Sequence, residues 1–254
     1  MTLVRSPRVT VFPDARTAAR VVADRIVAAL EARPALVLGL PTGRTPVALY
    51  DELVRLTRRR RADWSAATTF NLDEFVGLPP EHPGSYRQFM QAHLFSHVNL
   101  DPRRINFLDG TASPAEECRR YERAIAASDG IDIQVLGIGT NGHIGFNEPG
   151  RELQSRTHCA TLRPETRRNN AALFGGNVEL VPTRALSMGM ATILQARAVI
   201  LLANGHSKAG CIEGVVNGPL TTDLPASFLQ LHHEVDIIVD AAAAKDLEPA
   251  GRGL

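Results

Sequence analysis

Short apolar runs alternate with amphipathic stretches along most of the chain, and this alternation limits the fold more than any other feature. The run 35–40 contains no polar residue, as expected for a strand buried on both faces of a parallel sheet. A turn rich in Gly, Pro and Thr follows this run, and then an amphipathic stretch. The strands expected from this pattern are 9–12, 35–40, 67–72, 131–136, 198–203 and 235–239. The expected helices are 14–30, 46–56, 84–95, 114–127, 168–174, 206–216 and 240–246.

Strands that alternate with helices predict an α/β fold with a doubly wound, mostly parallel sheet flanked by helices, a Rossmann-like three-layer sandwich. The 254 residues, 44% of them apolar, are enough for a single domain over 1–254. Right-handed crossovers place the carboxyl ends of all the strands at one edge. Ligands of open α/β sheets bind at that edge, so the loops that leave the strands are the candidates for function.

The charge of the chain gives no support to a nucleic-acid or membrane partner. Its formal net charge is +1, so an anionic ligand must be held by a local site. The run Arg58–Arg61 falls at the end of an expected helix, where cations complement the helix dipole, and is interpreted as a solvated helix end.

The cysteine and hydropathy patterns favour a cytoplasmic protein. The three cysteines, Cys118, Cys159 and Cys211, are widely spaced and predict no disulfide framework. No stretch approaches the ~18 apolar residues of a membrane span, and the first nine residues contain no apolar signal region.

Two of the strand-end loops are candidates for binding phosphate. Thr42, Gly43, Arg44 and Thr45 lie between a strand and a helix, where free backbone N–H groups, hydroxyls and a guanidinium can surround an anion. The spacing is not that of a Walker loop, and an ordinary strand-to-helix turn remains an alternative. Lys208 opens another helix, an unfavourable place for a cation unless an anion joins it there; a surface lysine is the alternative.

Two other loops are candidates for acid–base chemistry. Asp73 and Glu74 follow a strand, where one could be a desolvated general base; a helix-capping or salt-bridged pair is the alternative. The loop 137–150 contains a formal GxGxxG, but its later Gly, Asn and Pro residues forbid the helix that a dinucleotide site needs. We interpret this loop, with His143 and Glu148, as a catalytic loop rather than a structural loop with a core histidine. No cluster with zinc-ligand spacing is present, so no metal is expected. No GxSxG elbow, the motif of a serine nucleophile, is present either.

Several long strings resemble the glucosamine-6-phosphate deaminase (isomerase) family of the sugar-phosphate isomerase-like superfamily. They are LGLPTGRTP (38–46), TFNLDEFVGLPPEHPGSY (69–86), GIGTNGHIGFNEPG (137–150) and VPTRALSMG (181–189). The resemblance covers roughly residues 35–235. It implies aldose–ketose isomerisation and deamination of glucosamine 6-phosphate to fructose 6-phosphate and ammonia, in amino-sugar catabolism, with no cofactor.

The resemblance also implies roles for single residues. Asp73 would move the C2 proton, and His143 would open the sugar ring. Glu148 and Asn141 would orient that histidine. The turn 42–45 and Lys208 would hold the phosphate. Position 141 is Asp in many members of the family, and an amide cannot stabilise an imidazolium as a carboxylate does, so Glu148 becomes the more important partner.

Two further departures from the family pattern lead to expectations. Many members have a phosphate-binding arginine where this chain has Ala172, and a small residue where it has Arg44, so Arg44 is expected to replace the missing charge. Arg167 or Arg168 could supply it instead. The stretches 151–152 and 158–160 do not keep the pattern that binds N-acetylglucosamine 6-phosphate in activated members, so no activation by that ligand is expected.

Other functions stay open from the sequence. The same reaction on galactosamine 6-phosphate differs by one hydroxyl position of the substrate. A 6-phosphogluconolactonase would share the fold and the phosphate turn, and a sugar-phosphate sensor would need no catalytic residues. The presence of both Asp73 and His143 favours the deaminase over the last two. A homo-oligomer is left open.

Overall fold

The computed structural model describes residues 7–247, and the predicted domain 1–254 begins and ends outside that range. The strands are β1 (Arg8–Phe12), β2 (Val37–Leu40), β3 (Thr68–Asn71), β4 (Asp73–Phe75), β5 (Ile105–Asn106), β6 (Ile133–Leu136), β7 (His158–Thr161), β8 (Arg184–Ser187), β9 (Ala198–Ala203) and β10 (Val235–Asp240). The α-helices are α1 (Ala15–Ala32), α2 (Val47–Arg58), α3 (Tyr86–His93), α4 (Pro114–Ala127), α5 (Pro164–Asn170), α6 (Met190–Leu194) and α7 (Ala209–Asn217). Short 3₁₀ turns include η3 (Ala171–Phe174) and η5 (His206–Lys208).

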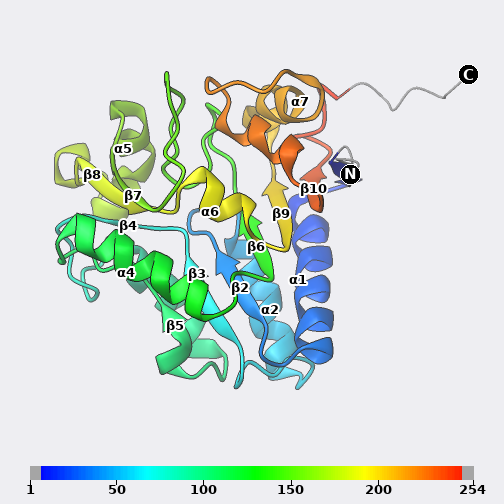
Figure 1. The fold of residues 1–254 in the computed structure, drawn as a ribbon. Coiled ribbons are helices and arrows are strands. Elements are labelled where there is room, and N and C mark those ends of the chain that lie inside the picture. The colour runs from blue at the N-terminus through cyan, green and yellow to red at the C-terminus, as the bar shows by residue number, and fades with distance from the viewer. Residues whose placement is uncertain (1–6, 248–254) are drawn as a thin grey trace, which may run out of the picture.

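Seven strands form the central sheet, in the order β1-β10-β9-β6-β2-β3-β5, and every pair in it is parallel. All six strands predicted from the apolar runs are present in this sheet; β9 has the predicted bounds, and the ends of the other five differ by at most two residues. The seventh, β5, is only two residues long and was not predicted. The predicted doubly wound α/β fold is confirmed (Figure 1).

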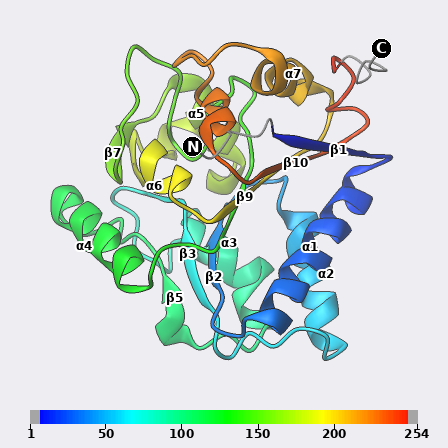
Figure 2. The ribbon, with the colours of Figure 1, turned by 45° about the vertical axis from the view of Figure 1, so that its right-hand side comes forward.

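Both faces of the sheet are covered, because alternate residues of each strand enter different cores. In β2, Leu38 and Leu40 pack in the core beneath α1 and α2, whereas Val37 packs in the core on the other face. In β9, Ile200 and Leu202 join the first core, and the alternating residues Val199, Leu201 and Ala203 join the second. Figure 2 shows α1 and α2 on one side of the sheet and α4 and α6 on the other.

A second sheet, which the sequence did not predict, lies beside the first. It has the order β4-β8-β7 and is antiparallel. Its strands are three or four residues long, and in β4 the polar pair Asp73–Glu74 replaces the apolar run that marks a central strand. This sheet adds a layer next to the carboxyl edge of the central sheet (Figure 1).

Most predicted helices are present, with one error. The predicted helix 168–174 begins earlier, as α5, and ends as η3, while 206–216 forms η5 and then α7. The predicted helix over 240–246 is wrong, because Asp240 still belongs to β10 and the residues after it form successive turns. The carboxylate of Asp240 accepts hydrogen bonds from the N–H groups of Gly205 and Ala243, which ties this segment to the loop after β9.

The surface features agree with a solvated helix end for the arginine run. Arg58 ends α2, and all four arginines of the run are exposed. Among residues 7–247, no helix is both long enough and apolar enough to cross a membrane.

Candidate active site

A cavity of about 590 Å³ lies at the carboxyl edge of the central sheet. Its walls come from the segments that follow four adjacent strands, β9, β6, β2 and β3, and from the α5–η3 segment. Seven of the predicted site residues line it together: Thr42, Gly43, Arg44, Thr45, Asp73, His143 and Lys208. The other two, Asn141 and Glu148, contact or approach His143 without lining the cavity.

The turn after β2 has the geometry of an anion site. Gly43 has φ of +99°, a conformation that side chains rarely adopt, and this lets the backbone turn sharply toward α2. The helix begins after Pro46 without a side-chain cap, so its first N–H groups have no side-chain acceptor. Because Thr45 and Val47 both line the cavity, these groups and the helix dipole are close to any bound anion.

Lys208 and Arg44 are the two cationic side chains on this wall of the cavity, among the residues described. Burial lowers the pKa of Lys208 below its usual value, and the nearby positive charge of Arg44 lowers it further. A bound anion is expected to reduce the repulsion between these two positive charges.

The alternative sources of positive charge lie elsewhere. Arg167 donates to the backbone carbonyls of Val178 and Val181, which holds it away from the cavity, and Arg168 is exposed and does not line the cavity. Ala172 does line it.

The two adjacent acids after β3 have different surroundings, because successive residues of a strand face opposite sides. Asp73 is 6% exposed and faces the cavity, and its Oδ1 has no hydrogen-bond partner. Burial, with the charge of Glu74, raises the pKa of Asp73 to about 8, although the Thr42 hydroxyl acts in the opposite direction. An acid of this kind can exchange a proton near neutral pH.

Glu74 instead caps α3. Its carboxylate accepts hydrogen bonds from the N–H groups of Phe75 (2.8 Å), Tyr86 (3.0 Å) and Arg87 (3.0 Å) and from the hydroxyl of Ser85 (2.8 Å). Both interpretations of the acidic pair are therefore realised, one by each residue: Asp73 faces the cavity and Glu74 is a helix cap.

The glycine-rich loop after β6 carries His143 into the cavity and forms no helix. The interpretation against a dinucleotide site therefore agrees with the structure. Gly139 lies so close to the imidazole that a Cβ there would approach it to 2.3 Å. Gly145, with φ of +57°, brings the same loop near Asp73, since a Cβ on Gly145 would lie 3.8 Å from Asp73 Oδ2.

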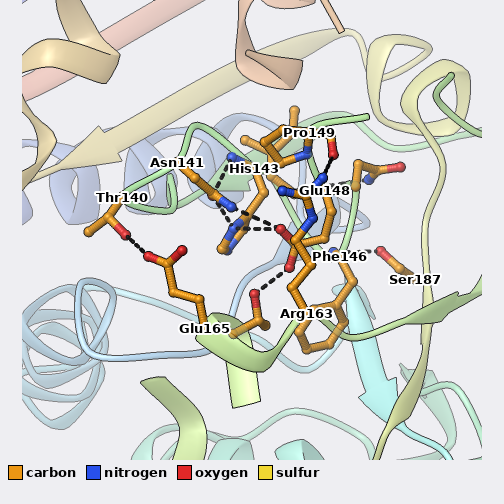
Figure 3. A network of polar contacts seen from close by, with 12 residues as sticks. Thr140, Asn141, His143, Phe146, Glu148, Pro149, Arg163, Glu165 and Ser187 are labelled. Atoms are coloured by element: carbon orange, nitrogen blue, oxygen red, sulfur yellow. Dashed lines mark hydrogen bonds and ion pairs between the residues drawn. The ribbon is translucent and has the colours of Figure 1, made fainter. Parts of the chain in front are cut away.

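His143 is held by Asn141 and Glu148 (Figure 3). Its Nδ1 lies 2.6 Å from Asn141 Oδ1 and 3.6 Å from Glu148 Oε2. The amide nitrogen of Asn141 donates to Glu148 Oε2 at 3.0 Å. Burial lowers the pKa of His143, Glu148 opposes that shift, and Lys208 adds to it, so the neutral imidazole is favoured.

The sequence analysis missed the part of the site that does not come from strand ends. Tyr86 and Phe89 of α3, and Thr166 and Asn170 of α5, also line the cavity. Thr166 donates a hydrogen bond to Glu148 Oε1, 18 residues away along the chain. No local motif marks such a contact, because it depends on how α5 packs against the loop.

Comparisons with known proteins show the family to which the chain belongs. The profile of the family described as glucosamine-6-phosphate isomerases/6-phosphogluconolactonase matches residues 14–238. A glucosamine-6-phosphate deaminase of Beutenbergia cavernae is 48% identical over 243 residues, 95% of this chain and 93% of the relative. Glucosamine-6-phosphate deaminase 2 of Bacillus subtilis is 47% identical over 223 residues, 87% of this chain and 90% of the relative.

Solved structures give the same result. A monomeric glucosamine-6-phosphate deaminase superposes with a TM-score of 0.90 at 39% identity, over 94% of this chain and 99% of the other. A 6-phosphogluconolactonase of Trypanosoma cruzi has a TM-score of 0.74 at 21% identity, over 96% of this chain and 97% of the other, a likeness of fold alone. The chain therefore belongs to the glucosamine-6-phosphate isomerase/6-phosphogluconolactonase family, on its glucosamine-6-phosphate deaminase branch, as its sequence strings predicted.

Proposed function

We propose that this protein converts glucosamine 6-phosphate and water to fructose 6-phosphate and ammonia, in amino-sugar catabolism. The observation that carries the proposal is the convergence on one cavity of a buried carboxyl group, Asp73, an imidazole, His143, and an anion site with Arg44 and Lys208. A phosphorylated aldose held at one end by its phosphate would present its reacting carbons to the carboxyl and imidazole groups.

His143 is proposed to open the sugar ring. Asn141 Oδ1 accepts the Nδ1 proton, which leaves Nε2 with a lone pair. Nε2 can take the proton of the C1 hydroxyl and return one to the ring oxygen, which yields the open-chain aldehyde. Glu148, close to Nδ1, stabilises the imidazolium that exists between these two transfers.

Asp73 is proposed to carry the proton between C2 and C1. As a carboxylate it takes the C2 proton of the open-chain sugar, which gives an enediol-type intermediate, and it then delivers that proton to C1. The resulting imine at C2 adds water and releases ammonia. Because burial raises the pKa of Asp73 to about 8, the positive charge of the substrate amine near C2 would favour the carboxylate form that the first step needs.

The phosphate is proposed to bind at the turn 42–45. Gly43 shapes this turn, Thr42 and Thr45 offer hydroxyl groups, and Arg44 and Lys208 supply the charge. The isomerisation oxidises C2 and reduces C1 within the same molecule, so no electrons go to or come from an external group, and we propose that the enzyme needs no redox cofactor. We also propose that it needs no metal, because Asp73 and His143 supply the proton transfers.

Release of ammonia from a panel of phosphorylated sugars tests the proposal. The panel holds glucosamine 6-phosphate, galactosamine 6-phosphate and 6-phosphogluconolactone, and Asp73→Asn and His143→Gln are the control variants. We expect glucosamine 6-phosphate to give the highest kcat/KM, and both variants to lose at least about 100-fold in kcat. Preference for the galactosamine epimer would correct the substrate, and lactone hydrolysis without ammonia release would overturn the proposal.

The place of action is proposed to be the cytoplasm, where the three free cysteines would stay reduced. A homo-oligomer remains open as a prediction, because the solved deaminase at 39% identity is described as monomeric.

A further inference from the structure

Four side chains, three from the glycine-rich loop after β6 and one from α5, form a continuous series of hydrogen bonds that ends at His143. Thr166 Oγ1, in α5, donates to Glu148 Oε1. Glu148 Oε2 accepts from Asn141 Nδ2 at 3.0 Å, and Asn141 Oδ1 lies 2.6 Å from His143 Nδ1. Thr166 is 3% exposed, so no water competes easily for its hydroxyl. In Figure 3, dashed lines join Asn141 to both His143 and Glu148.

An amide at position 141 creates a problem of orientation that a carboxylate would not have. The two ends of an asparagine amide differ, since one end only donates and the other only accepts. If the amide of Asn141 turned over, its NH₂ group would face His143 Nδ1, and the imidazole would have to carry its proton on Nε2. The lone pair would then lie on the wrong nitrogen for a base that faces the cavity.

Glu148 removes this ambiguity only while its carboxylate keeps its place. An ionised carboxylate accepts hydrogen bonds and does not donate, so it holds the NH₂ end of Asn141 and turns Oδ1 toward His143. The Glu148 side chain has one further side-chain hydrogen bond among the residues described, which comes from Thr166. The backbone beside Glu148 is also tied to this part of the chain, because Arg163 donates to the carbonyl of Pro149.

We infer that Thr166 is a positioning residue that sets the tautomer of His143 from α5, through Glu148 and the amide of Asn141. It touches no reacting atom in this arrangement. The inference rests on the proposed function for its kinetic consequence, but the tautomer of His143 can be observed without any substrate.

The test compares Thr166→Val, which keeps the shape and removes the hydroxyl, with Thr166→Ser, which keeps the hydroxyl. Long-range ¹H–¹⁵N NMR of the histidine side chains, assigned with a His143→Gln variant, reports which ring nitrogen carries the proton. We expect the protein and Thr166→Ser to have the proton on Nδ1 and Thr166→Val to have a mixture of tautomers. We expect kcat to fall by about 10- to 100-fold in Thr166→Val with KM within about twofold, as for loss of a hydrogen bond to a charged group.

The same substitution in an Asn141→Asp protein distinguishes a positioning role of Thr166 from a role in packing alone. With Asn141→Asp, the residue at 141 has two equivalent acceptor oxygens and cannot present a donor when ionised, so Thr166→Val should cost less than about threefold in kcat there. Equal losses in both backgrounds, an unchanged tautomer in Thr166→Val, or an equally impaired Thr166→Ser would overturn the inference. Thermal melts check that each variant is folded. If Thr166→Val does not fold, Thr166→Ala takes its place. If the protein releases no ammonia but the tautomer shifts as expected, the proposed function fails and the inference stands.

Discussion

At the scale of single residues, positive charge has a specific place in this site. Arg44 and Lys208 line the cavity, and so does Ala172, the position at which the resemblance leads us to expect an arginine in many members of the family. Arg167 is committed to backbone carbonyls. Of Arg44, Arg167 and Arg168, only Arg44 lines the cavity, so we still expect it to supply the charge that binds the phosphate.

Arg44→Ala is expected to raise KM for glucosamine 6-phosphate by about tenfold or more, with kcat nearly unchanged. The reason is that a phosphate contact far from the reacting carbons contributes equally to the ground state and the transition state, about 1.5–3 kcal/mol for a charged hydrogen bond. Steady-state kinetics measure the effect, with Arg58→Ala as a matched surface control. An unchanged KM in Arg44→Ala would show that the charge comes from another residue.

The raised pKa of Asp73 leads to a prediction about stability. Burial raises the pKa of this carboxyl group from its ordinary value of 3.8 to about 8 in the folded protein, so between these two pH values the folded state holds a proton that the unfolded state releases. Stability from this group is therefore lost as pH rises from about 4 to about 8. An asparagine at position 73 does not ionise, so Asp73→Asn should not lose stability in this way. Its free energy of unfolding is expected to exceed that of the parent by about 1–3 kcal/mol at pH 8, with little difference near pH 4.

Urea unfolding of the parent and of Asp73→Asn at several values between pH 4 and pH 8 checks this sign. The difference in free energy of unfolding should grow with pH. A constant difference would mean that Asp73 titrates near its ordinary value and is not desolvated as the structure implies.

At the scale of secondary structure, Asp73, which we propose carries the proton, and Glu74, which caps α3, share one short strand, β4. Glu74 fixes the start of α3, the helix that brings Tyr86 and Phe89 to the cavity. This arrangement makes the position of one cavity wall depend on a buried carboxylate that takes no part in the chemistry.

Glu74→Gln is expected to destabilise the protein by about 1–3 kcal/mol, because the amide presents a donor to a cluster of N–H and O–H donors. KM should rise only a few-fold, and Asp73 should remain able to act. The matched control is Glu116→Gln, which removes an acid from the first turn of α4 at an exposed position. Thermal melts measure the effect. An equal drop in melting temperature for Glu74→Gln and Glu116→Gln would contradict a specific role of Glu74 as the buried cap of α3.

The elements that sequence predicted well are those with a local signature. Apolar runs located the six long strands of the central sheet, and the loops after them contained Asp73 and His143. The sheet β4-β8-β7 could not be predicted, because Asp73 pairs with Ser187 far along the chain and the strands have no apolar run. Thr166 was missed for the same physical reason, since its partner is set by packing of α5 and not by spacing.

At the scale of the whole molecule, the question is whether a second ligand can control the site. The resemblance leads us to expect that the stretches 151–152 and 158–160 correspond to the effector contact of activated members of the family. Here Glu152 is exposed and adds a negative charge, and Ala160 lies in β7, the edge strand of the second sheet, without a charge to offer. An anionic sugar phosphate would meet repulsion at Glu152 rather than a basic pocket.

The rate of ammonia release is therefore expected to depend hyperbolically on glucosamine 6-phosphate, both with and without N-acetylglucosamine 6-phosphate. An effector can shift an equilibrium only by binding one state more tightly than another, and these residues provide no such difference. Initial rates over a wide substrate range, at two protein concentrations, measure the shape of the curve. The N-acetylated ligand should act only as a weak competitor for the phosphate site, which raises KM without changing kcat. A sigmoidal curve that becomes hyperbolic on its addition would show that an effector site exists on other residues.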